Sequence, residues 1–208
     1  MNVGIIGSGG RENSICFALS KSRKVDKIFC MPGNAGTENI SKNLNIDINN
    51  FQQIKNAVEK NKINFIIVGP EKPLVDGIVD FFNGSNIKVF GPNKAASQLE
   101  GSKIFTKKLC QKYNIPTAKF GIFKDLRDSK EFINNSSFPI VIKADGLASG
   151  KGVYISENKE EAYKAVDEIF NGKFGEAKNI LIEEFLKGEE MSYFIITDGK
   201  SIKAFETA

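Results

Sequence analysis

Short apolar runs alternate with amphipathic stretches over the first ninety residues. We expect a strand at each of the runs 2–6, 27–31, 63–69 and 87–91. Apolar side chains recur at helical spacing in residues 11–20, 51–61 and about 74–82, so we expect helices there. Strands that alternate with helices predict a parallel, doubly wound sheet that binds ligands at the carboxyl ends of its strands.

The pattern changes after residues 91–117, which hold two helical stretches between Gly91-Pro92 and Pro116. Beyond that segment, strand-like runs lie at residues 138–144, 152–155, 179–185, 192–197 and 201–205. One helix is predicted at about 159–170, where Asn158 is a candidate N-terminal cap. A region rich in strands with few helices predicts a small α+β unit on an antiparallel sheet.

Composition narrows the classes of function. Of the 208 residues, 41% are hydrophobic and 26% are charged, which is typical of a globular protein. The net charge of +4 comes without a block of Lys or Arg, so it favours anionic small molecules over nucleic acid. Apolar runs stay well short of the roughly 18 residues of a membrane span, and the N-terminus resembles a strand more than a signal peptide. We therefore expect a cytoplasmic protein.

Two residue types limit the chemistry. The cysteines Cys16, Cys30 and Cys110 are few and far apart, which indicates free thiols in apolar segments, not a disulfide framework or a zinc site. The chain has no histidine, which excludes sites of the Ser-His-Asp and Cys-His types and histidine metal sites. Acid–base chemistry would have to come from Asp, Glu, Lys, Tyr or the substrate.

A glycine-rich loop follows the first expected strand and has the sequence GSGGREN, residues 7–13. Backbone amides at the start of a helix bind anions. A dinucleotide fingerprint would need a third glycine at position 12, where Glu12 stands and would repel a pyrophosphate, so NAD binding is disfavoured. A tight turn without a ligand remains possible, as does a sugar-phosphate site in which Arg11 holds phosphate and Glu12 accepts from hydroxyl or amine groups.

Two more loops follow later strands of the same expected sheet, PGNAGT at residues 32–37 and GPEKPLVDG at residues 69–77. All three loops would lie at one edge, because the carboxyl ends of parallel strands do. Each loop alone is an ordinary turn, but together they predict a binding crevice. Glu71 is a candidate site residue, the alternative being a solvated carboxylate in a turn.

The stretch KADGLASGKGV, residues 143–153, resembles a phosphate loop in composition. Only three residues separate Gly146 from Gly150, and Gly152 follows Lys151, so the Walker A spacing is absent. The stretch also joins two expected strands. It therefore predicts either a hairpin that folds over phosphates, with Lys143 reaching them, or a flexible hairpin without a ligand.

A strand ends in the sequence LIEEFLKGEEMS, residues 181–192. Adenine sites commonly use backbone groups at such a strand end, with a carboxylate for the ribose. Glu190 lies seven residues after Glu183, which suits that arrangement. The pattern is weak alone, because acidic turns between strands are common.

In order, these motifs resemble the phosphoribosylamine–glycine ligase family, whose members have an ATP-grasp fold behind a Rossmann-like domain. The resemblance rests on GSGGREN, PGNAGT, GPEKPLVDG, GPNKAASQLEGSKIFTK, IPTA, PIVIKADGLASGKGV and IEEFLKGEEMS, and it covers essentially the whole chain. It implies an α/β fold: a Rossmann-like parallel-sheet N-terminal domain, then a linker and the small α+β subdomain of a truncated ATP-grasp fold. The implied boundaries are 1–101, 102–123 for the linker, 124–194 for the small subdomain, and 195–208 for the start of an incomplete second subdomain.

The resemblance implies ATP-dependent ligation of glycine to 5-phosphoribosylamine through a glycyl phosphate, in purine biosynthesis. Such chemistry needs no histidine and no protein nucleophile, and would depend on positioning and charge neutralisation. The residues implied to bind ATP are Lys103, Lys143, Gly146, Ser149, Gly150, Lys151, Gly152, Glu183, Glu184, Leu186 and Glu190. Those implied to face the phosphoribosylamine are Gly9, Gly10, Arg11, Glu12, Asn34 and Glu71.

The chain departs from the family pattern in places. Asn13 stands where His is usual, Lys72 where a small residue is usual, and Ser149 where Ala is usual. The family's magnesium ligands are expected beyond residue 208, so we expect no metal site within this chain. If the chain is the whole protein, we expect it to bind ATP weakly and to catalyse no turnover. We also expect apolar surface to be exposed at its end. The alternatives are another ATP-grasp ligase of the purine pathway and a non-catalytic nucleotide-binding module.

Overall fold

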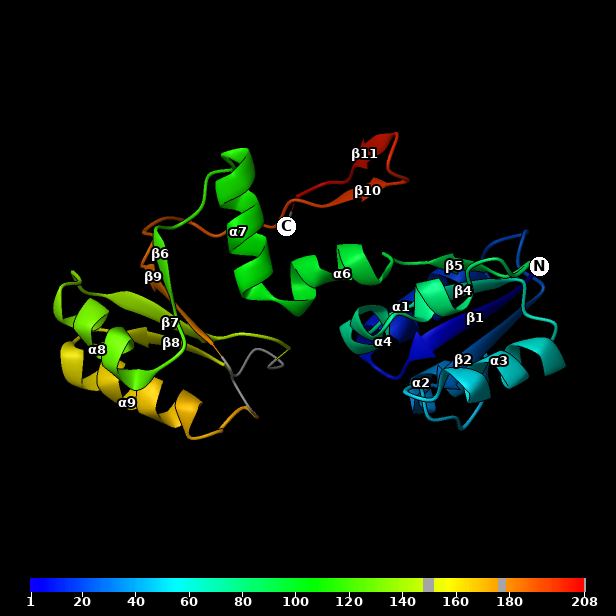
Figure 1. The fold of residues 1–208 in the computed structure, drawn as a ribbon. Coiled ribbons are helices and arrows are strands. Elements are labelled where there is room, and N and C mark those ends of the chain that lie inside the picture. The colour runs from blue at the N-terminus through cyan, green and yellow to red at the C-terminus, as the bar shows by residue number, and fades with distance from the viewer. Residues whose placement is uncertain (148–151, 176–178, 208) are drawn as a thin grey trace.

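The computed structural model of the chain describes residues 1–147, 152–175 and 179–207. Two α/β units lie at opposite ends of the molecule, and a pair of helices joins them (Figure 1). The last residues form a small two-stranded hairpin that belongs to neither of the two main sheets (Figure 1). The predicted change of architecture along the chain is therefore present in space as well as in sequence.

The first unit is built on a parallel sheet with the strand order β3-β2-β1-β4-β5. Its strands are β1 Asn2–Gly7, β2 Lys27–Pro32, β3 Lys42–Asn43, β4 Phe65–Val68 and β5 Lys88–Phe90. Its helices are α1 Gly10–Ser20, α2 Ala35–Glu38, α3 Phe51–Lys60, α4 Glu71–Asp76 and α5 Ile78–Phe81. The predicted parallel sheet is confirmed. Strands β2 and β3 lie on one side of β1, and β4 and β5 lie on the other, so the strand order reverses at β1. A reversal of this kind creates a crevice at the carboxyl ends of β1 and its neighbours.

β1 is buried on both faces, as its continuous apolar run predicts. Val3 and Ile5 pack with Cys16 of α1 on one face of the sheet. Ile6 packs on the other face with Ile54 of α3. The two faces together form the core that fixes the position of the loop after β1.

The single helix expected at about 74–82 is wrong: α4 and α5 are separate helices. Gly77 lies between them with φ 101°, a left-handed conformation that glycine adopts readily. Its amide donates to the carbonyls of Pro73 and Leu74, at 3.1 and 3.0 Å, which closes α4. The apolar spacing continues through this break, so the pattern of side chains alone did not reveal it.

The cysteines are free thiols, as expected. The packing of α1 against the sheet nevertheless brings the sulfurs of Cys16 and Cys30 within 3.0 Å of each other, although they are distant in sequence. Burial, together with the neighbouring Cys30 sulfur, raises the pKa of Cys16 to about 12. The Cys16 thiol is therefore neutral and part of the core.

Two helices connect the units, α6 Lys94–Gly101 and α7 Lys103–Tyr113, as the sequence predicted. Ser102 separates them: its backbone is extended, with φ −142°, and its side chain caps α7 by accepting from the Phe105 amide at 3.1 Å. The direction of the chain changes at this residue, and α7 runs toward the second unit (Figure 1).

The second unit is built on an antiparallel sheet with the order β6-β9-β7-β8. Its strands are β6 Phe120–Phe123, β7 Ile140–Ala144, β8 Val153–Ser156 and β9 Ile180–Glu184. The helices α8 Leu126–Asn134 and α9 Lys159–Phe170 cover one face of it (Figure 1). The predicted antiparallel α+β unit and the helix at 159–170 are confirmed.

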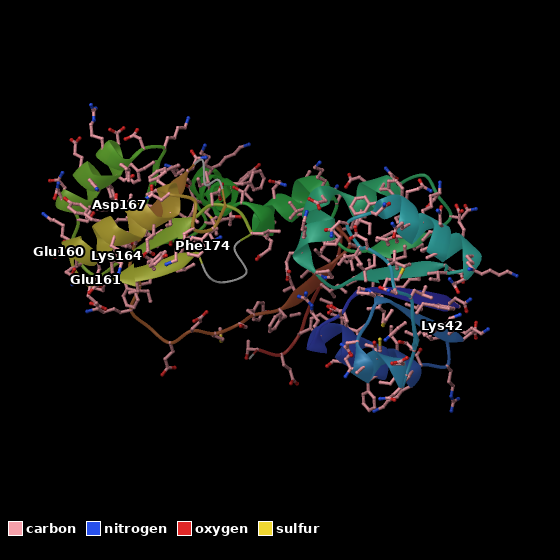
Figure 2. All side chains as sticks on the ribbon, turned by 90° about the horizontal axis from the view of Figure 1, so that it is seen from below. Lys42, Glu160, Glu161, Lys164, Asp167 and Phe174 are labelled. Atoms are coloured by element: carbon pink, nitrogen blue, oxygen red, sulfur yellow. The ribbon has the colours of Figure 1, made fainter. Side chains whose placement is uncertain are left out.

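The amphipathic pattern of α9 explains how it packs. Ala162, Val166 and Ile169 are buried against the sheet. Glu160 and Lys164 are exposed and project from the outer side of the helix (Figure 2). The core of this unit therefore lies between the two helices and one face of the sheet, which leaves the opposite face for other contacts.

Neither α8 nor β6 was predicted. In α8, Ile133 is the large side chain that is fully buried, whereas Leu126 and Phe132 are 39% and 38% exposed. Ser129 and Ile133, one helical turn apart, are fully buried, and Leu126 precedes Ile133 by two turns, so helical spacing was present in the sequence. That spacing and the Asp125 cap, which accepts from the Asp128 amide at 2.9 Å, were the available signals.

After β9 the chain extends to a hairpin of β10 Ile195–Thr197 and β11 Ile202–Ala204. The two strands lie within runs that the sequence predicted as strand. Ile195 and Ile202 are 51% and 71% exposed, so the hairpin presents apolar side chains to solvent. Over the described ranges, the helices are too short or too polar to cross a membrane.

Candidate functional site

The loops after β1, β2 and β4 meet at one edge of the parallel sheet, as predicted. The Asn34 side chain, from the loop after β2, donates to the Ser8 and Gly9 carbonyls at 2.8 and 3.2 Å. Arg11, at the start of α1, donates to Glu71 after β4 at 3.1 Å. Hydrogen bonds thus join the first loop to both of the others, which gives a connected surface where the sequence predicted a crevice.

Glu12 lies beneath this surface, whereas the sequence analysis had it facing the ligand. It is 3% exposed, and both carboxylate oxygens have protein partners. Oε2 accepts from the Gly9 amide at 2.6 Å, and Oε1 accepts from Arg11 Nε at 3.1 Å. Any Cβ at Gly7 or Gly69 would lie closer than 3.0 Å to the Glu12 side chain. The glycines of these loops therefore make room for a carboxylate, which explains the loss of the dinucleotide pattern.

The remaining residues of this surface differ in exposure and in how far the protein's own hydrogen bonds occupy their side chains. Asn34 uses its carbonyl oxygen to cap α2, accepting from the Gly36 and Thr37 amides at 2.7 and 3.0 Å, so its side chain holds the loop. Gly10 is exposed, and a Cβ there would meet nothing within 4 Å. Arg11 is half exposed, at 54% of its side chain, and is available to an anion.

Two pKa shifts follow from the Arg11 contacts. The pKa of Glu71 is lowered mainly because its own backbone amide hydrogen-bonds to the carboxylate; Arg11 adds to the effect and partial burial opposes it. Burial lowers the pKa of Arg11, but the hydrogen bonds to Glu12 and Glu71 outweigh it and the pKa is raised. Both groups are charged at neutral pH.

Asn13, where the family usually has His, lies beside this surface. Its side-chain oxygen is buried and has no hydrogen-bond partner among the described residues. Its amide nitrogen would lie 3.1 Å from a Cβ placed at Gly36, so α1 and α2 are in close contact there. The residue can donate or accept but cannot titrate near neutral pH.

A cavity of about 770 Å³ opens between the loop after β4 and the second unit. It is lined by Glu71 and Lys72 from the first unit, by α7, and by the facing strands β7, β8 and β9. Six of the residues predicted from the sequence line it: Glu71, Lys103, Lys143, Gly146, Gly152 and Glu183. The structure therefore brings one predicted substrate residue to the same cavity as five predicted ATP residues.

Lys143 and Glu183 face this cavity because of the register of two strands. Lys143 is opposite Leu181, and Val141 is opposite Glu183. Lys143 and Glu183 are thus diagonal neighbours on the sheet face turned away from α8 and α9. The Lys143 ammonium donates to Glu183 Oε2 at 3.1 Å.

Glu183 is 5% exposed, and a buried carboxylate is stable only with charged or hydrogen-bonding partners. Lys107 of α7 supplies a second ammonium, 3.2 Å from the same Oε2. The other oxygen, Oε1, is buried without a hydrogen-bond partner in the described part of the chain. That oxygen is a free acceptor at the wall of the cavity.

The start of α7 is tied to the start of the glycine-rich hairpin. Asp145 accepts from the Ser102 hydroxyl and the Ile104 amide, at 3.1 and 3.2 Å, which places a carboxylate at the N-terminus of α7. The Lys103 ammonium donates to the Gly146 carbonyl at 2.8 Å. Lys103 therefore lies where the sequence placed it, beside the first glycine of the predicted flap.

The other predicted ATP residues are not brought together here. Glu184 accepts from the Lys119 amide at 2.9 Å and is exposed. Leu186 is 64% exposed, and Glu190 is exposed. Ser149, Gly150 and Lys151, the centre of the predicted flap, lie outside the described residues.

The sequence analysis missed three residues of this site: Lys107, Thr117 and Asp145. Lys107 follows Lys103 by one helical turn, so the two ammoniums share a face of α7. That spacing was the available signal. Across residues 1–147, 152–175 and 179–207, we find no group of three or more Cys, Asp or Glu side chains that could hold a metal ion.

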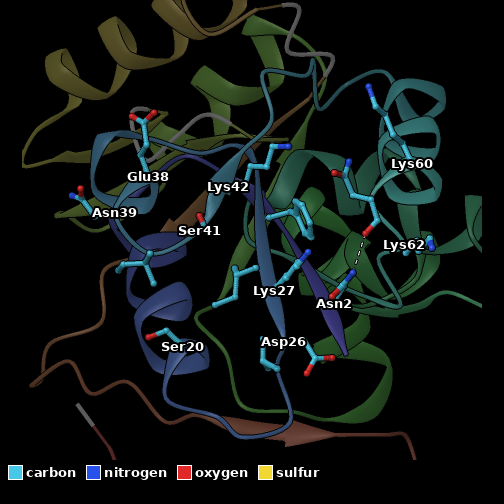
Figure 3. A pocket seen from close by; sticks show the side chains of 15 residues that line it. Asn2, Ser20, Asp26, Lys27, Glu38, Asn39, Ser41, Lys42, Lys60 and Lys62 are labelled. Carbon is cyan, nitrogen blue, oxygen red and sulfur yellow. Dashed lines mark hydrogen bonds between the residues drawn. The ribbon is translucent and has the colours of Figure 1, made fainter.

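Another hollow, of about 840 Å³, lies elsewhere in the first unit (Figure 3). It is lined by residues at the beginnings of β1 and β2, including Asn2 and Lys27, and by Lys42 and Lys60. Open parallel sheets bind ligands at the carboxyl ends of their strands, and this hollow is at the opposite ends. We therefore assign no site to it.

The family described as "Phosphoribosylglycinamide synthetase, N domain" matches residues 1–100, and its ATP-grasp (A) domain matches residues 101–208. Phosphoribosylamine–glycine ligase of Mesorhizobium japonicum is 46% identical over the whole chain, which covers 49% of that protein. The enzyme of the same name from Clostridium acetobutylicum is 44% identical, with 99% of this chain and 50% of that protein covered. The chain thus spans about half the length of the curated relatives it matches.

Solved structures agree with these sequence matches. The crystal structure of phosphoribosylamine–glycine ligase from Thermotoga maritima superposes with a TM-score of 0.83 at 32% identity, covering 100% of this chain and 49% of that one. An ADP complex of N5-carboxyaminoimidazole ribonucleotide synthetase superposes with a TM-score of 0.75 at 18% identity, over 99% of this chain and 53% of that one. At that identity the second likeness speaks for the fold alone.

Proposed function

Since the chain belongs to the phosphoribosylglycinamide synthetase family, we propose that it provides the phosphoribosylamine surface and part of the ATP site of an enzyme that joins glycine to 5-phosphoribosylamine. ATP would activate glycine as glycyl phosphate, and the amine of phosphoribosylamine would then displace phosphate. The observation that carries the proposal is the cavity shared by Glu71 of the first unit and by Lys103, Lys143 and Glu183.

The cavity suits a nucleoside triphosphate in both volume and charge. A ligand site typically measures about 300–1,000 Å³. Lys103, Lys107 and Lys143 bring three ammoniums to its wall, and ammoniums bind phosphate oxygens strongly in a site that excludes water. Gly146 and Gly152, at the two ends of the predicted flap, would let the backbone approach the phosphates.

Glu183 would serve the adenine end. Its Oε1 is a buried acceptor without a partner among the described residues, and the exocyclic amine of adenine is a donor. We assign Glu184, Leu186 and Glu190 to the rest of the adenosine, as the family resemblance implies. Ser149, Gly150 and Lys151 belong to the flap in the same proposal.

The connected loops of the first unit would hold phosphoribosylamine. Arg11 is accessible at the rim, and Gly9 and Gly10 are exposed at the start of α1, where the helix favours an anion. The Gly10 amide would meet that anion, because the Gly9 amide already donates to Glu12. Glu71, paired with Arg11, faces the shared cavity and is placed to direct the amine toward the activated glycine. Glu12 and Asn34 would hold these loops in shape from beneath.

Catalysis in this proposal rests on positioning and charge neutralisation. Magnesium would neutralise the triphosphate further, and the described residues hold no cluster of ligands for it. The proposed setting is the cytoplasm, with small molecules as the partners. The domain division expected from the sequence, with its first boundary at residue 101, is retained.

Thermal shift of the chain with MgATP, MgADP, ribose 5-phosphate and NADH tests the proposal. We expect stabilisation by the adenine nucleotides and by ribose 5-phosphate. Lys143→Met should remove the ATP effect and leave the ribose 5-phosphate effect, and Arg11→Gln should do the reverse. Stabilisation by NADH without any by MgATP would contradict the proposal and favour an oxidoreductase.

A coupled assay of ADP release tests the complete reaction. In a protein that contains this chain within the full length of its relatives, release should require both glycine and phosphoribosylamine. ATP binding without release that depends on the two substrates would favour the alternative of a nucleotide-binding module, and release that depends on a different carboxylate would favour another ATP-grasp ligase.

A further inference from the structure

Lys107 is held in the wall of the cavity by several partners at once. Its side chain is 12% exposed, and its ammonium is 3.2 Å from Glu183 Oε2. It also donates to the Thr117 hydroxyl at 2.6 Å, and it lies 5.6 Å from the centre of the Phe120 ring. A lysine fixed by a carboxylate, a hydroxyl and an aromatic ring is not free to follow a ligand.

Lys143 is in a different position. Its side chain is 26% exposed, and its contact with the carboxylate is a single hydrogen bond of 3.1 Å to the same Oε2 of Glu183. Two ammoniums therefore share one carboxylate oxygen. One carboxylate neutralises one of them, so the group of three carries a net charge of +1 at the more exposed lysine.

We propose that Lys107 is a positioning residue for the nucleotide phosphates, an inference that rests on the proposed function. Lys107 neutralises and holds Glu183, so that Lys143 keeps its charge for a phosphate. The arrangement gives a positioning role to the lysine that ends GSKIFTK and to the threonine of IPTA, which has no role of its own in the proposed function.

The physical reason is competition for Lys143. Without Lys107, the buried Glu183 would have Lys143 as its one cation among the described residues, and a phosphate would have to take that ammonium from a buried carboxylate. With Lys107 present, Glu183 stays paired when Lys143 turns to the phosphate. Lys107 thus acts through Glu183 and does not need to touch the nucleotide.

Isothermal titration of the chain with MgATP tests this inference. Lys107→Met should weaken MgATP binding by roughly 10- to 100-fold. Losses of this order follow when a buried charged group loses one of its partners. Lys107→Arg restores the charge and should bind within about threefold of the original chain. Lys108→Met, one residue along α7 and exposed, is the matched control and should leave binding unchanged.

The decisive measurement repeats Lys107→Met in a Glu183→Gln background. With no carboxylate to neutralise, the loss should shrink to less than about threefold, because coupled residues are not additive. An undiminished loss would overturn the inference and make Lys107 a direct phosphate ligand. If Lys107→Met alone does not fold, the comparison of Glu183→Gln with the double variant still decides.

Failure of the two proposals can be told apart. No binding of MgATP by the original chain would overturn the proposed function and this inference with it. Normal binding by the original chain and by Lys107→Met would overturn the inference alone.

Discussion

Replacement of Glu12 by Ala should destabilise the first unit without touching the second. Glu12 is 3% exposed, and its Oε2 accepts from the Gly9 amide at 2.6 Å. The change removes that acceptor at the start of α1 and opens a void beside Gly7 and Gly69, whose lack of a Cβ makes room for the carboxylate. The loop that carries Arg11 then loses its support from beneath.

The expected loss can be built from its parts. A helix cap contributes about 1 kcal/mol. A hydrogen bond to a charged group contributes about 1.5–3 kcal/mol, and this range includes part of the cap. The contact with Arg11 adds little, because the Arg11 side chain is 54% exposed. Removal of the carboxylate also removes the cost of desolvating it, which acts in the opposite direction. We therefore expect the free energy of unfolding to fall by about 2–3 kcal/mol.

Urea unfolding can separate the two units. The chain has no Trp, and its four tyrosines, Tyr113, Tyr154, Tyr163 and Tyr193, all lie beyond residue 101. Tyr154 and Tyr163 belong to the second unit, whereas Tyr113 and Tyr193 are 61% and 63% exposed and should change little on unfolding. The tyrosine fluorescence transition therefore reports the second unit, while far-UV circular dichroism follows both. Glu12→Ala should lower the stability of the circular-dichroism transition and leave the tyrosine transition in place.

Glu12→Gln is the matched control, because its amide oxygen can still accept from Gly9. It should lose less than Glu12→Ala. A loss of under about 0.5 kcal/mol for Glu12→Ala, or equal losses for the two variants, would refute the structural role that the hydrogen bond implies.

Other predictions follow from burial and charge. Gly69→Ala would place a Cβ against Glu12 Oε1, and we expect a loss of about 1–3 kcal/mol in the circular-dichroism transition, as for other overpacked sites; an unchanged midpoint would contradict this. Ile142→Ala empties a fully buried site of the second unit and should lower the tyrosine transition by about 2–5 kcal/mol, whereas a shift confined to the first unit would argue against the packing described. The lowered pKa of Glu71 means that its contribution is present above the ordinary pKa of about 4.3 and is lost as the pH falls below it. Glu71→Gln should therefore flatten the acid limb of the stability profile, and a limb of unchanged slope would show that neither the Glu71 backbone amide nor Arg11 stabilises the native charge.

The sequence predicted most of the fold because the strand patterns of the first unit differ from those of the second. Continuous apolar runs such as that of β1 indicate a strand buried on both faces, and the structure has a parallel sheet there. In the second unit, several strand-like runs accompany few helical stretches, which indicates an antiparallel sheet. The structure has an antiparallel sheet there, with helices on one face.

The features that were missed depend on tertiary contacts. The break at Gly77 interrupts a helix whose apolar spacing continues. Cys16 and Cys30 meet because α1 packs on the sheet, which spacing along the chain cannot express. In each case the packing of one element on another decided the outcome.

The candidate site shows the same division. Lys103, Lys143 and Glu183, which the sequence proposed as ATP residues, line one cavity. Glu12 is buried beneath its loop, and the sequence cannot say whether a carboxylate near glycines faces outward or fills the space they leave. Lys107 was missed because its partner belongs to a strand 76 residues later, brought near by the docking of α7.

α7 ties the parts of the candidate ATP site into one body. Its N-terminus is held by Asp145, at the start of the glycine-rich hairpin, and its second turn is held by Glu183 through Lys107. Lys103 and Lys107 therefore keep fixed distances from the strands that carry Lys143. A rotation of α7 would break the contacts at both ends together, so the spacing of the three ammoniums is set by the docking of the helix on the sheet. Preorganised charge of this kind is what a site that works by positioning and neutralisation requires.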